Sequence, residues 1–169
     1  MANGFSGYDS KTVVVLGVGN ILFGDDGLGP KVVEHLKENY SIPENVSVLD
    51  AGCSARSILF DILLSDKKPE KIIIIDAFDI GHKPGKIFEV NIDDIPENKI
   101  DDFSMHQVPT SNLLKELRDA SKIDIRIISC QPQTIPDTVS IGLSKKISDV
   151  IPKLCSLIIK EIGRQSKHL

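Results

Sequence analysis

The sequence predicts a single α/β domain in which a twisted, mostly parallel sheet of about five strands is sandwiched between helices (α/β/α). Short apolar runs alternate along the chain with stretches in which apolar residues recur at helical spacing. The chain has 169 residues, of which 41% are hydrophobic, and this length suits one core. We expect residues 1–169 to form one domain, with residues 1–11 as a flexible N-terminal extension.

The first half of the chain is expected to contain three strands and two helices. The run IIII at 72–75 is the strongest strand signal, because four isoleucines in a row suit a strand that is buried on both faces. The expected order is strand Val13–Gly17, helix Leu28–Asn39, strand Val46–Asp50, helix Ser54–Ser65 and strand Lys71–Asp76.

The second half is expected to add two strands and two helices. Pro152 lies inside the last helix, where it should kink the helix or mark a late start, because proline lacks a backbone N–H. Thr110 or Ser111 should cap the first helix of this half. The expected order is strand Gly85–Ile92 after a PG turn, helix Thr110–Ala120, strand Asp124–Cys130 and helix Ser144–Gly163.

The alternation of strands and helices also predicts where function lies. Parallel strands joined by right-handed crossovers carry their binding residues beyond the carboxyl ends of the strands. Those ends correspond to loops 17–27, 50–54, 76–84 and 130–138.

Composition excludes several classes of partner. The net charge is −4, with both signs mixed along the chain, which argues against nucleic acid as the main partner. Apolar runs of about five residues are too short to span a membrane. The N-terminal MANGFSGYDSK lacks an apolar signal-peptide core, so we expect a cytoplasmic protein. The three cysteines form no CxxC pair, which argues against a zinc ribbon.

The stretch GVGNILFGDDGLG, residues 17–29, stands where a dinucleotide-binding loop would stand. Asp50, at the position of a ribose-binding acid, favours that interpretation, but Leu22 replaces the third glycine and Asp25 and Asp26 precede the helix. A helix N-terminus favours an anion by about 0.3–1 kcal/mol. A carboxylate about 4 Å from a phosphate opposes it by about 4 kcal/mol at an effective dielectric near 20. The loop is therefore a poor phosphate site.

Three side chains are candidates for chemistry at this edge. We expect Asp25 to be mainly structural, as a cap of the following helix, so Asp26 is the carboxylate that the loop presents. Asp76 ends the central apolar strand, and His106 precedes a helix. Two carboxylates and an imidazole suit a divalent transition metal such as nickel or zinc. No spacing rule links residues so far apart. The alternatives remain that Asp76 is a turn residue at the end of its strand and that His106 is a surface histidine.

Five stretches of the chain resemble the endopeptidases that mature nickel–iron hydrogenases. They are VVVLGVGNILFGDDGLGPKVVEHL, VSVLDAG, IIIIDAFDIGHKPGKIFEV, SMHQ and the QP of ISCQPQ. The pattern GNxLxxDDGxG with a downstream DA and xH is specific, and the resemblance covers nearly the whole chain. The stretch IPENKIDDFSMHQVPTSNLLKELRD further resembles the branch that serves deazaflavin-reducing hydrogenases of methanogenic archaea.

The resemblance implies an α/β/α endopeptidase that removes a C-terminal extension from a hydrogenase large-subunit precursor after nickel insertion. The metal-contacting residues of the family fall on Asp26, Asp76 and His106, with Asp26 and Asp76 catalytic. The implied metal is nickel supplied by the substrate. Whether the free enzyme holds another divalent metal stays an open question. The implied partner is the precursor, with no nucleic acid and no membrane, and we expect a monomer.

Substrate contacts are expected from Gly19, Asn20 and Gly24 in the glycine-rich loop and from Cys53. The backbone amides around Gly19 and Gly24 are candidates for holding the extended substrate or the oxyanion. The usual D-x-G-T-x-G of the family is DAGCSA here, with Cys53 in place of the threonine. A cysteine nucleophile is not favoured, because no histidine is placed by sequence to activate Cys53.

Two alternatives to a protease that reads the metal remain open. Asp26 and Asp76 could form a pepsin-like dyad that shares one proton, without a metal role. A non-cleaving checkpoint chaperone for nickel or the large subunit would use the same residues. We favour the metal interpretation because it gives His106 a purpose.

Overall fold

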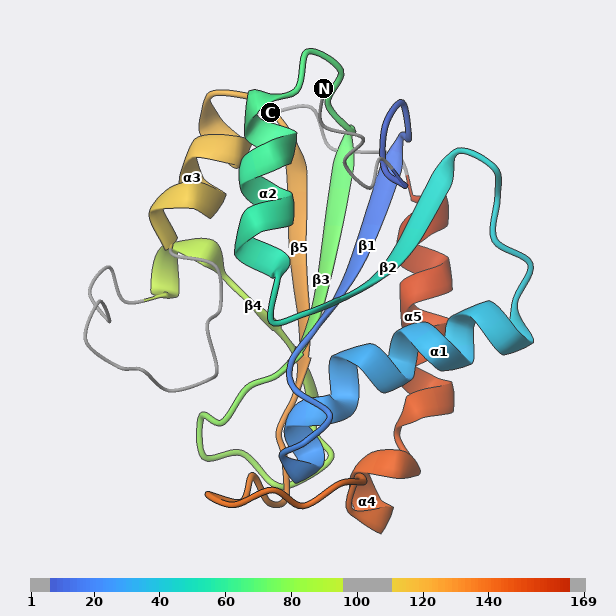
Figure 1. Cartoon of the computed structure of the whole chain (residues 1–169), viewed down its shortest axis with the longest axis vertical. Helices are drawn as coiled ribbons and strands as arrows, with labels where there is room; N and C mark the ends of the chain where they lie inside the picture. The colour runs from blue at the N-terminus through green and yellow to red at the C-terminus, as the bar shows by residue number, and fades with distance from the viewer. Residues whose placement is uncertain (1–6, 96–110, 165–169) are drawn as a thin grey trace.

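The structure is a computed structural model that describes residues 7–95 and 111–164 (Figure 1). The strands are β1 (Val13–Val18), β2 (Val46–Gly52), β3 (Lys71–Ala77), β4 (Ile87–Val90) and β5 (Asp124–Cys130). The α-helices are α1 (Leu28–Asn39), α2 (Ala55–Leu64), α3 (Ser111–Asp119), α4 (Lys145–Ser148) and α5 (Ile151–Gly163). Two short 3₁₀-helices are η1 (Gly24–Gly27) and η2 (Ile92–Asp94).

The five strands form one sheet in the order β2-β1-β3-β5-β4. The pairs β1–β2, β1–β3 and β3–β5 are parallel, and β4 pairs with β5 in the antiparallel sense. The predicted fold class, a mostly parallel sheet of about five strands, is confirmed.

Helices cover both faces of the sheet, and each face has its own apolar core. Ile73 and Ile75 of β3 pack in one core with α1 and α5, whereas Ile72 and Ile74 pack in a second core with α2 and α3. Figure 1 shows these helix pairs on opposite sides of the strands. The isoleucine run is buried throughout, as predicted, because alternate side chains of the central strand enter different cores.

Helix α1 lies directly against the backbone of the sheet. A Cβ atom at Gly29 would overlap the backbone of Val18 and lie 2.6 Å from the carbonyl oxygen of Ile75. Gly17 makes the matching approach from β1, where a Cβ would overlap the backbone of Gly29. These contacts hold the start of α1 over the ends of β1 and β3.

Two expected elements differ most from their predicted ranges. The last helix is divided into α4 and α5, and Pro152 lies in the first turn of α5, so the late start is confirmed. Strand β4 is shorter than expected because the Asn91 side chain accepts the Asp93 N–H at 3.1 Å and turns the chain into η2. The expected cap Thr110 and residues 1–6 of the expected extension lie outside the described residues. Within residues 7–95 and 111–164, no helix is long and apolar enough to cross a membrane.

Candidate functional site

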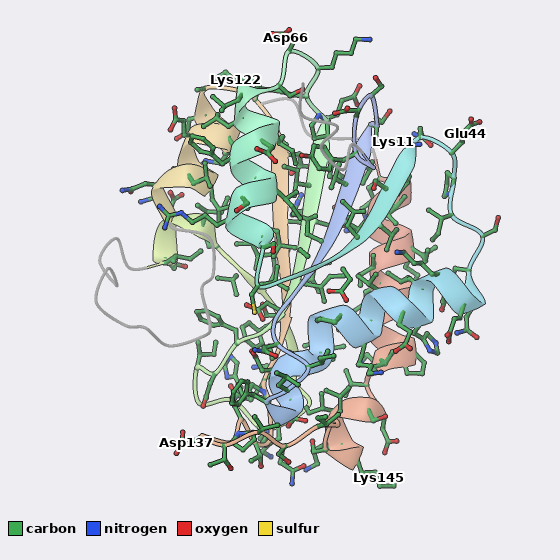
Figure 2. All side chains as sticks on the ribbon, in the orientation of Figure 1. Lys11, Glu44, Asp66, Lys122, Asp137 and Lys145 are labelled. Atoms are coloured by element: carbon green, nitrogen blue, oxygen red, sulfur yellow. The ribbon has the colours of Figure 1, made fainter. Side chains whose placement is uncertain are left out.

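The candidate site lies where the order of the strands reverses. The chain passes from β1 outward to β2 and then returns to β3 on the other side of β1. In open α/β sheets, ligands bind beyond the carboxyl ends of the strands at such a switch point. Loops 19–27, 77–86 and 131–144 gather at this end (Figure 1, bottom). Figure 2 labels Asp137 and Lys145 at this end, and Asp66 and Lys122 at the opposite end.

Asp26 and Asp76 lie at this edge, the first in the segment that follows β1 and the second near the end of β3. Helix η1 carries Asp26, whose Oδ2 accepts the backbone N–H of Asn20 at 2.9 Å. Asp76 is the penultimate residue of β3. Both are buried, with 1% of Asp26 and 5% of Asp76 exposed. Asp26 is therefore not a solvent-exposed residue beside the start of the helix.

The two carboxylates interact electrostatically. Burial raises the pKa of the Asp76 carboxyl well above its ordinary range, and the charge of Asp26 raises this pKa further. A hydrogen bond with the backbone of Ala77 opposes part of that rise. Two buried carboxylates that interact in this way can share one proton or bind a cation between them. The geometry is therefore compatible with both a metal-reading site and an aspartic dyad.

His106, the third predicted ligand, lies outside the described residues. Among residues 7–95 and 111–164, no group of three His, Cys, Asp or Glu side chains is arranged to hold a metal ion. The convergence of Asp26, Asp76 and His106 on one metal therefore stays a prediction.

The loop with Gly19, Asn20 and Gly24 is hydrogen-bonded to the end of β2 and to loop 131–144. The amide of Gly19 donates to the Gly52 carbonyl at 3.1 Å, and that of Gly24 donates to the Ser140 carbonyl at 2.8 Å. Both amides are thus occupied in this structure, and the expectation that amides around Gly19 and Gly24 hold the extended substrate or the oxyanion stays a prediction. Gly19, at φ +131°, is required because the Asp26 carbonyl fills the space of a Cβ.

Asp25 is structural, as expected, but not as a helix cap. Its carboxylate makes no cap bond to α1. It accepts backbone N–H groups from Gln133 at 2.8 Å, Thr134 at 2.9 Å and Ser144 at 2.7 Å, and also the Ser144 hydroxyl. Asp25 therefore ties loop 131–144 to the loop that carries Asp26.

We expect Asp25→Asn to lower the free energy of unfolding by about 1.5–3 kcal/mol, because an amide nitrogen cannot accept the hydrogen bonds that a carboxylate oxygen accepts. Urea denaturation followed by circular dichroism measures this change. Asp50→Asn, an exposed residue at the same edge, is the control and should stay within about 0.5 kcal/mol of wild type. Equal stability of the two variants would show that the Asp25 contacts contribute little.

Gln131 also organises this edge, and the residue pattern alone did not assign it a role. Its side-chain carbonyl accepts the N–H groups of Ile80 at 3.0 Å and His82 at 3.1 Å, and its amide donates to Asp79 at 2.7 Å. These bonds fasten loop 77–86 to the end of β5. The QP of ISCQPQ, one of the stretches that resemble the hydrogenase endopeptidases, was the signal in the sequence that could have identified Gln131.

Cys53 follows β2 with an exposed, unpaired thiol, and its predicted role in substrate binding stays a prediction.

Comparisons with known proteins agree on one family. Residues 30–161 match the family model for hydrogenase maturation protease. A protein of Methanocaldococcus jannaschii, named provisionally as a hydrogenase maturation protease, is 38% identical over 91% of this chain and 98% of its own. The coenzyme F420 hydrogenase subunit delta of Methanothermobacter thermautotrophicus is 34% identical over 92% of this chain and 97% of its own.

Solved structures give the same result. The [NiFe] hydrogenase maturation protease HycI of Thermococcus kodakarensis superposes with a TM-score of 0.72 at 26% identity, covering 93% of this chain and 96% of its own. The hydrogenase maturating endopeptidase HybD of Escherichia coli gives a TM-score of 0.72 at 27% identity, over 89% and 93% of the two chains. The chain therefore belongs to the hydrogenase maturation protease family and is a peptidase of hydrogenase maturation.

Proposed function

We propose that this peptidase removes the C-terminal extension of a nickel–iron hydrogenase large-subunit precursor after nickel insertion, and that Asp26, Asp76 and His106 bind the nickel that the precursor carries. The observation that carries the proposal is the pairing of two buried carboxylates at the switch point of the sheet. Like charges in a buried site repel each other, and a cation brought by the substrate would remove that repulsion.

The surface around the carboxylates suits a protein substrate. Exposed large aliphatic side chains gather in the loops at this edge: Ile21, Leu22, Ile80, Val139 and Ile141. Loops 19–27 and 131–144 are joined there by hydrogen bonds between Leu22, Gly24 and Ser140. Exposed apolar patches mark surfaces that bind other proteins. This edge therefore supports docking of a macromolecule beside the carboxylates.

We assign the chemistry on the same basis. The nickel held by the precursor can polarise the scissile carbonyl and lower the pKa of a bound water. Asp26 and Asp76 would hold that metal in place, with His106 as the third ligand. The similarity to a coenzyme F420 hydrogenase subunit supports a deazaflavin-reducing hydrogenase as the cognate substrate.

The substitution His106→Ala separates the metal interpretation from the aspartic dyad. Nickel-loaded precursor is incubated with wild type or His106→Ala, and the mass of the large subunit is measured. We expect wild type to shorten the subunit and His106→Ala to leave it intact, because the metal loses a ligand. His82→Ala is the control. His82 is a half-buried histidine of loop 77–86, and this variant should cleave the precursor.

Two results would contradict the proposal in different ways. Cleavage by His106→Ala at the wild-type rate would favour a dyad of Asp26 and Asp76. A stable complex of wild type with loaded precursor, without any shortening, would favour the checkpoint chaperone.

A further inference from the structure

Ser129 has a buried hydroxyl that no other group uses. The residue lies near the carboxyl end of β5 and is 0% exposed. Its Oγ has no hydrogen-bond partner. In the described part of the chain, one other buried side-chain oxygen shares this property, Asp124 Oδ2, and that atom lies 3.7 Å from the Lys71 ammonium. Ser129 is thus the one such hydroxyl among residues 7–95 and 111–164.

The register of the sheet places Ser129 beside Asp76. Ser129 pairs with Asp76 in the parallel ladder and with Phe88 in the antiparallel ladder, so these three side chains share one face. Ile127, two residues earlier in β5, packs in the core under α2 and α3, which identifies that face. Neighbouring strands are about 4.8 Å apart, so a χ1 rotation can bring the Ser129 hydroxyl within hydrogen-bond reach of the Asp76 carboxylate.

Phe88, the other residue that pairs with Ser129, cannot accept this hydrogen bond as a carboxylate does. Phe88 offers an aromatic ring, which the ring of His82 covers edge-on at a centroid distance of 5.1 Å. Of the two residues that pair with Ser129, Asp76 is therefore the polar one. A buried donor without a partner lowers stability, and alanine would avoid that cost. A buried, unpartnered hydroxyl beside a carboxylate points to a partner that it gains in another state of the site.

We propose that Ser129 is a positioning residue for Asp76. When the precursor enters the site, the Ser129 hydroxyl donates a hydrogen bond to one carboxylate oxygen of Asp76 and leaves the other oxygen directed at the substrate. The hydrogen bond fixes the carboxylate in the orientation that the reaction needs. This inference rests on the proposed function, because it requires Asp76 to act on the precursor.

The test compares Ser129→Ala with Ser47→Ala, a second buried serine that lies on β2 opposite Val14. Cleavage of purified nickel-loaded precursor is measured over a range of precursor concentrations, and thermal unfolding of each free variant is measured in parallel. We expect Ser129→Ala to unfold at the wild-type temperature or higher, to keep the KM, and to lower kcat about tenfold to a hundredfold. Ser47→Ala should cleave at the wild-type rate.

Three results would overturn the assignment of Ser129. They are a kcat within about twofold of wild type, a lower kcat accompanied by a lower unfolding temperature, and a change confined to KM. The second would mean that the hydroxyl serves the folded structure, and the third that it serves substrate binding. Absence of cleavage by wild type would overturn the proposed function itself, and the inference with it.

Discussion

Asp76→Asn is expected to abolish cleavage and, at neutral pH, to make the protein more stable. Loss of a carboxylate that acts at the reacting centre lowers rates by about 10²–10⁴-fold. Burial and the charge of Asp26 disfavour the ionised form of Asp76 in the folded state. A neutral amide avoids that cost, so the unfolding temperature should rise while activity falls. Thermal unfolding and the mass of the processed subunit measure the two effects.

The gain in stability should depend on pH in a defined direction. The folded-state pKa of Asp76 is raised above its ordinary value of 3.8. The loss of stability that this pKa shift causes is therefore zero below the ordinary value. It grows as the pH rises toward the raised pKa and is constant above it. The stability difference between Asp76→Asn and wild type should be small near pH 3.5 and largest at neutral pH.

Asp79→Asn is the matched control with the opposite sign. Asp79 lies in the turn after β3, and its hydrogen bonds from Gln131 and Gly81 lower its pKa. Its ionised form therefore stabilises the fold above the ordinary pKa, and the asparagine variant should be less stable at neutral pH. A stability difference for Asp76→Asn that does not change with pH would contradict the assigned burial cost.

Lys71→Met is expected to lower the free energy of unfolding by about 3–5 kcal/mol, because it leaves buried carboxylate and carbonyl groups without their cation. The Lys71 side chain is 1% exposed, and its Nζ lies 3.3 Å from the Glu161 carboxylate. Nζ also donates to the Glu161 carbonyl at 3.0 Å and to the Arg164 carbonyl at 2.9 Å. This lysine joins the start of the central strand to the end of α5. Urea denaturation measures the loss.

Lys31→Met is the control, because Lys31 pairs with Glu34 at 2.8 Å on an exposed surface. We expect this variant to lose about 1 kcal/mol or less. The folded fraction of Lys71→Met should still cleave precursor normally, since Lys71 lies at the amino end of β3, opposite Asp76. Equal stability losses in the two lysine variants would mean that burial does not strengthen the Lys71 contacts.

The sequence was sufficient where one physical signal dominated. The bounds of α1 match the predicted range Leu28–Asn39, because apolar spacing defines the helix and Asp25-Asp26-Gly27 precedes it. Strand β3 follows from its isoleucine run. The placement of Asp26 and Asp76 at one edge follows from the rule that parallel strands present their carboxyl ends together.

The sequence was not sufficient where partners are distant along the chain. The carboxylate of Asp25 binds groups 108, 109 and 119 residues away, so a local rule assigned it to the adjacent helix instead. The free hydroxyl of Ser129 could not be predicted, because it depends on the register between β3 and β5. The occupied amides of Gly19 and Gly24 likewise depend on β2 and loop 131–144.

The most direct test of metal recognition is a cleavage time course on purified nickel-free precursor in the presence of a chelator, beside the same precursor loaded with nickel. If Asp26, Asp76 and His106 read the nickel of the substrate, the nickel-free precursor lacks the cation that makes binding favourable. A few kcal/mol of charge interaction corresponds to a selectivity of about a hundredfold or more. We expect cleavage of the loaded precursor and little or none of the nickel-free precursor. Cleavage of both at the same rate would contradict metal recognition and favour an aspartic dyad of Asp26 and Asp76.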